Sequence, residues 1–198
     1  MRKSVKVVVI AAMLFFGYSA HAQIFGIRGG LGLATITSPN EFDNARFGST
    51  FGTRVGATLE FELIDETLFL GTGLGFSLKG ASTIGDNISF FYVESPVTVK
   101  YHIFDIGRSN AFYATSGFNL AVLAFGSDEG DPIEIGNQIG DEVKALDLGY
   151  QIGAGVIFDN RFEVGLLSEF GLLDISASDG DTLRNLTFMV SFAFKFGQ

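Results

Sequence analysis

Most of the chain alternates between apolar and polar side chains with a period of two, which is the pattern of a β-strand with two different faces. The alternation is clearest in residues 51–63, where Phe51, Val55 and Leu59 share one face and Arg54 and Glu60 the other. It recurs and predicts eight strands, at 24–36, 51–63, 68–79, 90–104, 112–125, 145–158, 161–172 and 184–196. No segment has helical periodicity, so the pattern indicates an all-β fold.

The two faces of these segments differ sharply in charge. The more apolar face of every segment carries no charged residue. The opposite face carries many glycines and the charged residues Arg28, Arg54, Glu60, Glu62, Lys79, Glu94, Lys100, Asp147, Glu163, Glu169 and Lys195, together with His102. A soluble barrel with an apolar interior would alternate in the same way. We expect the apolar face to point outward, because so many large side chains would overfill an eight-stranded barrel and glycines suit a crowded interior.

The connections between the segments alternate in length. Those after the first, third, fifth and seventh segments are long and polar, at 38–50, 80–89, 126–144 and 173–183. Those after the second, fourth and sixth are short, at 64–67, 105–111 and 159–160. Outer-membrane barrels have short periplasmic turns and longer external loops. The sequence therefore predicts an eight-stranded antiparallel up-and-down transmembrane β-barrel.

The N-terminal residues predict export. Arg2, Lys3 and Lys6 precede an apolar run of 12 residues, 7–18, and Ala20-His21-Ala22 then supplies a small-x-small cleavage pattern. A membrane anchor is the alternative, but a helix of that length spans about 18 Å and the hydrocarbon core is about 30 Å thick. We expect a signal peptide at 1–22, a barrel domain at 23–198, and a location in the bacterial outer membrane.

Composition narrows the possible functions. The chain has 26 Gly and 22 Phe with only 18% charged residues, a mixture that an ordinary soluble core does not need. A net charge of −9 argues against a nucleic-acid partner. The absence of cysteine excludes a cysteine nucleophile and any cysteine-ligated metal. We expect a monomeric barrel that contacts outer-membrane lipid and needs no cofactor.

Four stretches of the chain carry a family resemblance. They are G-I-R-G-G-L-G-L (Gly26 to Leu33), Y-V-E-S-P-V-T-V-K-Y (Tyr92 to Tyr101), L-G-Y-Q-I-G-A-G-V (Leu148 to Val156) and F-A-F-K-F (Phe192 to Phe196). An exported chain with these stretches resembles the PorT-type outer-membrane β-barrel domain family of Bacteroidetes. Glu94 and Pro96 match that family's L-E-[IV]-P-[LV]-x-x-K-Y pattern, and Ser95 departs from its usual aliphatic residue. The resemblance implies an outer-membrane barrel, and the family's name-giving member is associated with secretion of exported proteins.

The charges of the polar face are nearly balanced, with five basic and six acidic residues. The topology places Arg28, Glu60, Glu62, Lys100, His102, Glu163 and Lys195 toward the periplasmic end, and Arg54, Lys79 and Asp147 higher. A narrow ion or small-solute pore is one hypothesis for this lumen. We favour a set of internal ion pairs, because eight strands leave an interior filled by side chains.

Candidate chemistry is sparse. His102 is the only histidine outside the predicted signal peptide, so a histidine-rich metal site is excluded. A lipid-modifying outer-membrane enzyme would need a Ser/His-type constellation, and the sequence places no serine near His102 on the same face. We therefore expect no catalytic or metal site and keep the enzyme as the alternative.

Two further segments suggest how the protein makes contacts. The connection 126–144 carries Asp128, Glu129, Asp131, Glu134, Asp141 and Glu142, which predicts a solvated loop and, as a sharper hypothesis, a site for a divalent cation or a basic partner. The last segment alternates to a near-terminal Phe196 and resembles the C-terminal recognition strand of bacterial outer-membrane proteins. The sequence thus predicts a non-enzymatic barrel with a structural, secretion-associated or partner-binding role.

Overall fold

The computed structural model of the protein describes residues 23–39, 46–83, 86–107, 109–136, 138, 141–177 and 182–196. The predicted signal peptide lies outside the described residues. Among the residues that are described, no helix is long and apolar enough to cross a membrane. The strands are β1 (Gln23–Thr37), β2 (Thr50–Ile64), β3 (Leu68–Ser82), β4 (Asn87–Asp105), β5 (Ala111–Asp128), β6 (Asp131–Pro132), β7 (Leu146–Phe158), β8 (Phe162–Gly171) and β9 (Arg184–Phe196).

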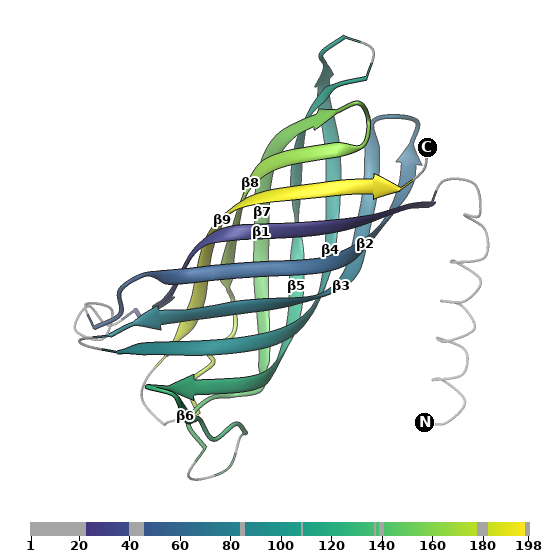
Figure 1. Cartoon of the computed structure of the whole chain (residues 1–198). Helices are drawn as coiled ribbons and strands as arrows, with labels where there is room; N and C mark the ends of the chain where they lie inside the picture. Colours follow the sequence, from purple (N-terminus) through teal and green to yellow (C-terminus); the bar gives the residue numbers. More distant parts are fainter. Residues whose placement is uncertain are drawn as a thin grey trace, which may run out of the picture.

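The long strands form one closed sheet. Each pairs antiparallel with the next long strand in the chain, and β6 adds two residues of pairing against the end of β5. The ring closes between β1 and β9, where Phe25 lies opposite Phe196 and Thr37 opposite Arg184. The predicted fold is confirmed: the protein is a closed eight-stranded antiparallel up-and-down β-barrel (Figure 1).

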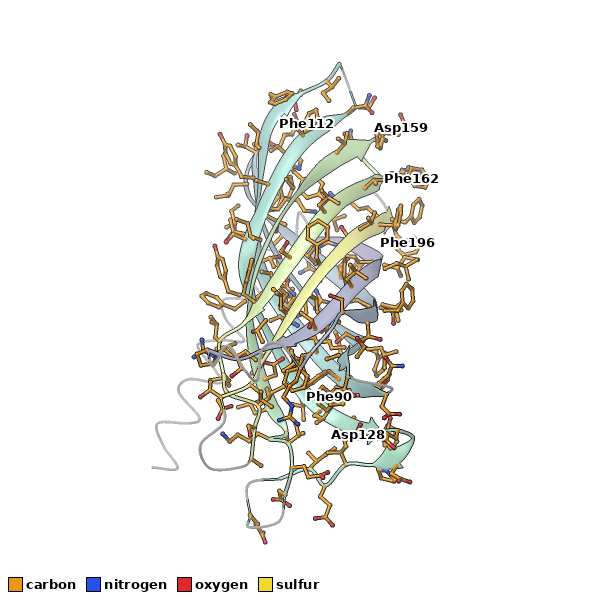
Figure 2. The ribbon with its side chains drawn as sticks, turned by 90° about the vertical axis from the view of Figure 1, so that its left-hand side faces the viewer. Phe90, Phe112, Asp128, Asp159, Phe162 and Phe196 are labelled. Carbon is orange, nitrogen blue, oxygen red and sulfur yellow. The ribbon has the colours of Figure 1, made fainter. Side chains whose placement is uncertain are left out.

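The two ends of the barrel differ. The short-turn end carries the turns 65–67, 106–110 and 159–161, the start of β1 and the end of β9, and it lies toward the upper right of Figure 1. The long-loop end carries the connections 38–49, 83–86, 133–145 and 172–183. Figure 2 places Phe112, Asp159, Phe162 and Phe196 near the first end and Asp128 at the other.

Two of the predicted long connections are shorter than expected. The β3–β4 ladder continues as far as Ser82 opposite Asn87, so the predicted link 80–89 shrinks to 83–86. The predicted loop 126–144 also begins too early, because β5 extends to Asp128 and turns directly into β6. Pairs such as Gly80 with Ser89 and Ser82 with Asn87 carry small or polar side chains, so the alternation of apolar positions did not reveal them.

The outer surface is strongly apolar, as the alternation predicts for a lipid-facing barrel. Leu74 is 62% exposed, Phe51 60% and Phe118 52%. Aromatic side chains gather near the short-turn end, where the ring centroids of Phe162 and Phe194 are 5.0 Å apart. Phe61 is the exception on the predicted outward face: it is buried, and the pairing of β2 with β3 becomes irregular just beyond it.

Candidate functional site

The alternation of β1, β2, β4, β8 and β9 brings one group of charged side chains together inside the barrel near its short-turn end. This short-turn cluster consists of Arg28, Glu60, Lys100, Glu163 and Lys195. Glu163 accepts from Arg28 at 2.8 Å, from Lys100 at 2.5 Å and from Lys195 at 2.9 Å. Glu60 contacts the same three cations. Two carboxylates therefore bridge three cations that come from three different strands.

A second group, the mid-barrel cluster, lies further toward the long-loop end. It consists of Arg54, Lys79, Glu94, Asp147 and Glu169. Arg54 binds Glu169 at 2.5 Å and also contacts Glu94. Lys79 contacts Glu169 and lies 3.4 Å from Asp147. The ion pairs of this cluster span the barrel from β2 and β3 to β7 and β8.

Neutral side chains complete the mid-barrel cluster. They are Ser77, Asn119, Gln151 and Asn185, all buried. Asn119 donates to Glu94 at 2.9 Å, Gln151 donates to Glu169 at 2.6 Å, and Asn185 donates to Asp147 at 2.9 Å. The sequence reasoning weighed only charged residues and missed these amides, although strand alternation places them on the same inward face.

A glycine makes room for one of the bridging carboxylates. Gly149 on β7 lies against Glu169, and a Cβ at that position would come within 2.6 Å of the Cγ atom of Glu169. The absence of a side chain at Gly149 thus lets the Glu169 carboxylate lie between Arg54 and Lys79. This is one physical reason for glycine on the inward face of a narrow barrel.

The charges of the two clusters balance overall. Together they hold five cations and five carboxylates, with one extra positive charge at the short-turn end and one extra negative charge in mid-barrel. A cavity of about 40 Å³ lies between them, lined on the inside by Arg28, Glu60, Arg54 and Glu94. That space holds on the order of three water molecules. The arrangement matches a lumen packed with side chains.

Two residues predicted for this network make other contacts. Glu62 accepts a hydrogen bond from the backbone N–H of Glu66 and so stabilises the β2–β3 turn. His102 packs its ring on Phe69, with ring centroids 4.7 Å apart, and its buried Nε2 atom has no hydrogen-bond partner. Both residues lie close to the short-turn end, where the alternation is interrupted by the irregular pairing of β2 with β3 and of β4 with β5.

The long-loop end of the lumen is closed by apolar side chains. This apolar cap is Ile36, Ala81, Phe90, Tyr92, Ala121, Leu123, Val143 and Ile175. Tyr92 is fully buried, and its hydroxyl accepts a hydrogen bond from Asn185 at 3.0 Å. The Lys79 ammonium lies 5.0 Å from the centroid of the Tyr92 ring. The sequence reasoning missed the cap, because it treated the inward face as polar along its whole length.

The acidic residues of the predicted loop are spread over several kinds of structure. Asp128 ends β5, Glu129 lies in the turn, and Asp131 belongs to β6. Glu134, Asp141 and Glu142 lie in the connection to β7, where Asp141 accepts a hydrogen bond from the backbone of Gln138 at 2.5 Å. No three or more His, Cys, Asp or Glu side chains among the described residues, these six included, form a group that could hold a metal ion.

An ion pair joins the connections 133–145 and 172–183 at this end. Lys144 donates to Asp174 at 2.8 Å, and the backbone N–H groups of Ser176 and Leu183 also donate to that carboxylate. Partial burial raises the pKa of Asp174, but these hydrogen bonds outweigh it and hold that pKa below its ordinary value. Asp174 therefore stabilises the connections in its charged form.

The lowered pKa of Asp174 predicts a pH-dependent contribution to stability. A carboxyl with a depressed folded-state pKa stabilises fully above its unfolded pKa of about 3.9, and loses that contribution as the pH falls through the folded value. We expect Asp174→Asn to lower the free energy of unfolding by about 1 kcal/mol at pH 7 and by less at pH 3. Urea unfolding in lipid bilayers at both pH values measures the difference, and an equal loss at both would contradict the assignment.

Comparison with known proteins places the chain in a family. Residues 21–177 match the model of the outer membrane protein beta-barrel domain. The chain belongs to this family of outer-membrane barrels. No curated protein matches it.

Solved structures show the same barrel at low sequence identity. Neisserial surface protein A is similar with a TM-score of 0.54 and 12% identity, covering 87% of this chain and 97% of that one. The outer membrane enzyme PagL is similar with a TM-score of 0.53 and 14% identity, covering 87% of this chain and 99% of that one. These likenesses show the fold, which the family shares with an enzyme as well as with a surface protein.

Proposed function

We propose that this outer-membrane barrel is a non-enzymatic binding protein that presents its long-loop end to partners outside the cell. The interior holds interlocked ion pairs and an apolar cap, which suits a rigid support. The long-loop end carries acidic residues on connections whose backbones are hydrogen-bonded to each other. Both features favour binding of a partner protein over transport of solutes or catalysis.

The observation that carries this proposal is the pairing of the connections 133–145 and 172–183 with each other. Val143 forms bridges with Ile135 and with Ser176. The backbone N–H of Lys144 donates to the carbonyl of Ile175 at 2.8 Å, and that of Ala177 donates to the carbonyl of Glu142 at 3.1 Å. Val143 and Ile175 also belong to the apolar cap. The connections are therefore held as one surface, and a preorganised surface loses less entropy on binding.

Site-specific crosslinking in intact cells tests this role. A photoreactive amino acid replaces Glu134, an exposed residue of the β5–β7 region, and the control replaces Asp159, exposed in a turn at the short-turn end. We expect a discrete adduct from position 134 that is absent from position 159. No adduct from position 134, or the same adduct from both, would contradict the proposal.

The resemblance to PorT-type barrels indicates a first class of partner. The name-giving member of that family is associated with secretion, so exported proteins that travel past the outer membrane are the candidates to seek among adducts at Glu134. This secretion-associated role is part of the proposal and depends on the identity of the adduct.

A lipid-modifying enzyme is the alternative, since PagL has the same fold. In that case His102 would have to be essential. It packs against Phe69 near the short-turn end, away from the long-loop surface. We expect a His102→Ala strain to keep unchanged lipid A by mass spectrometry, with normal barrel levels, and an altered lipid A profile would favour the enzyme.

A further inference from the structure

Beneath the paired connections lies a cavity of about 130 Å³ that the lumen clusters do not use. Its walls come from the ends of β1, β4 and β5 and from the connections around them. The lining is apolar except for two carboxylates: Ile36, Phe47, Ile88, Phe90, Ile133, Val143, Ile175 and Leu183, with Asp128 and Glu142. We refer to it as the acidic-rimmed cavity.

The walls of this cavity are held by hydrogen bonds and by packing. The backbone N–H of Ile133 donates to the carbonyl of Gly126 at 3.0 Å. Glu142 is tied to Glu134 twice, through its backbone N–H at 2.9 Å and through its carboxylate, which accepts from the Glu134 N–H at 3.2 Å. Phe90 and Ile175 belong to the buried apolar cap. The cavity is therefore largely preformed.

The volume of the cavity limits what it can hold. An apolar protein cavity of about 150 Å³ holds one benzene molecule. A cavity of 130 Å³ therefore accommodates one side chain of the size of leucine or phenylalanine, and not an acyl chain. Its occupant must enter as a single apolar group.

The negative charge at the rim of the cavity favours an apolar group that has positive charges beside it. Asp128 and Glu142 are exposed, and no basic side chain is among the lining residues. The basic residues next to the lining in the sequence are Arg46, Lys144 and Arg184, and Lys144 is already bound to Asp174. The negative charge is crowded here: a hydrogen bond shared with Asp86, and then the charges of Asp86, Asp128 and Asp131, raise the pKa of Glu129. A cation beside the apolar group would relieve this repulsion.

We propose that the acidic-rimmed cavity binds a basic peptide segment of a partner protein, inserting one apolar side chain while flanking lysine or arginine residues face Asp128 and Glu142. The proposal deepens the binding function above and rests on it. The partner is therefore expected to contain a segment with one apolar side chain flanked by positively charged residues.

Peptide binding to the full barrel tests this assignment. The barrel is placed in nanodiscs of phosphatidylcholine, which carry no net charge, and the probe is the labelled peptide acetyl-Lys-Lys-Phe-Lys-Lys-amide, with empty nanodiscs as the blank. Replacing the phenylalanine of the peptide by glycine should weaken binding about tenfold, because burial of the ring is lost. Replacing its lysines by glutamates should abolish binding.

Variants of the barrel locate the site. Ile133→Trp fills the cavity and should abolish binding, and Asp128→Asn with Glu142→Gln should weaken it by about tenfold at low salt. Asp159→Asn is the control, an exposed carboxylate in a turn at the short-turn end, and should change binding less than twofold. Heat-modifiable electrophoretic mobility verifies that each variant is folded.

Several results would overturn the proposal. Equal binding of the glycine peptide would mean that only surface charge attracts it. Unchanged binding by folded Ile133→Trp would place the peptide elsewhere, and equal competition by free phenylalanine amide would indicate a site for small amines. A discrete crosslink at Glu134 combined with any of these results would remove this inference alone, whereas loss of the crosslink would remove the binding function itself.

Discussion

Replacing Lys79 with methionine is expected to lower the free energy of unfolding of the barrel by about 3–5 kcal/mol, as removing one partner of a buried ion pair does. Lys79 is fully buried and contacts Glu169 and Asp147. Methionine has a similar volume, so the loss comes mainly from charge. Without Lys79, Arg54 faces three buried carboxylates alone. Urea unfolding in lipid bilayers measures the change.

Two further variants separate this effect from a general loss of packing. Lys144→Met removes a partly exposed pair with Asp174 and should cost about 0–1 kcal/mol. Adding Asp147→Asn to Lys79→Met reduces the excess negative charge and should restore part of the lost stability. A Lys79→Met barrel as stable as the Lys144→Met barrel would show that the mid-barrel cluster is solvated and does not contribute to the free energy of unfolding.

Deleting residues 194–198 is expected to abolish assembly. The deletion removes the pairs of Phe194, Lys195 and Phe196 with β1, which form part of the seam that closes the barrel. It also removes Lys195 from the short-turn cluster, where it contacts both Glu60 and Glu163. An unclosed sheet would leave backbone groups without partners in hydrocarbon.

The assay is the heat-modifiable mobility of the barrel in membranes isolated from cells. Deleting only residues 197–198 keeps every pair of the seam and serves as the matched control. We expect the shorter deletion to fold and the longer one to leave no heat-modifiable species. Normal folding of the longer deletion would show that the end of β9 is dispensable for closure.

Much of the fold could be predicted from the sequence because the membrane imposes a simple rule on each strand. A residue such as Leu74 or Phe118 must face lipid, so the polar residue beside it must face inward. Alternation therefore predicted the strands and the inward direction of Arg54, Glu94 and Lys100, and the alternating lengths of the connections predicted the up-and-down order of pairing. The predicted topology then placed the charges of β1, β2 and β4 at two heights along the lumen.

The rule fails where the surroundings change. Tyr92 and Phe90 lie on the inward face, between the mid-barrel cluster and the long-loop end. A period-two alternation of side chains does not distinguish an apolar cap from a polar lumen. Glu62 lies beside an irregularity in pairing, which only the register reveals. The acidic-rimmed cavity needs Ile133 and Ile175 to meet across two connections, and no local pattern encodes that contact.

The most direct test of a barrel sealed by its own side chains is the current across a planar lipid bilayer that contains the purified, folded protein. A known porin inserted under the same conditions provides the reference current. Because the two ion clusters and the apolar cap close the lumen, we predict no steady conductance above that of the bare bilayer. A stable, ion-selective current that scales with the amount of inserted barrel would show that the lumen is open.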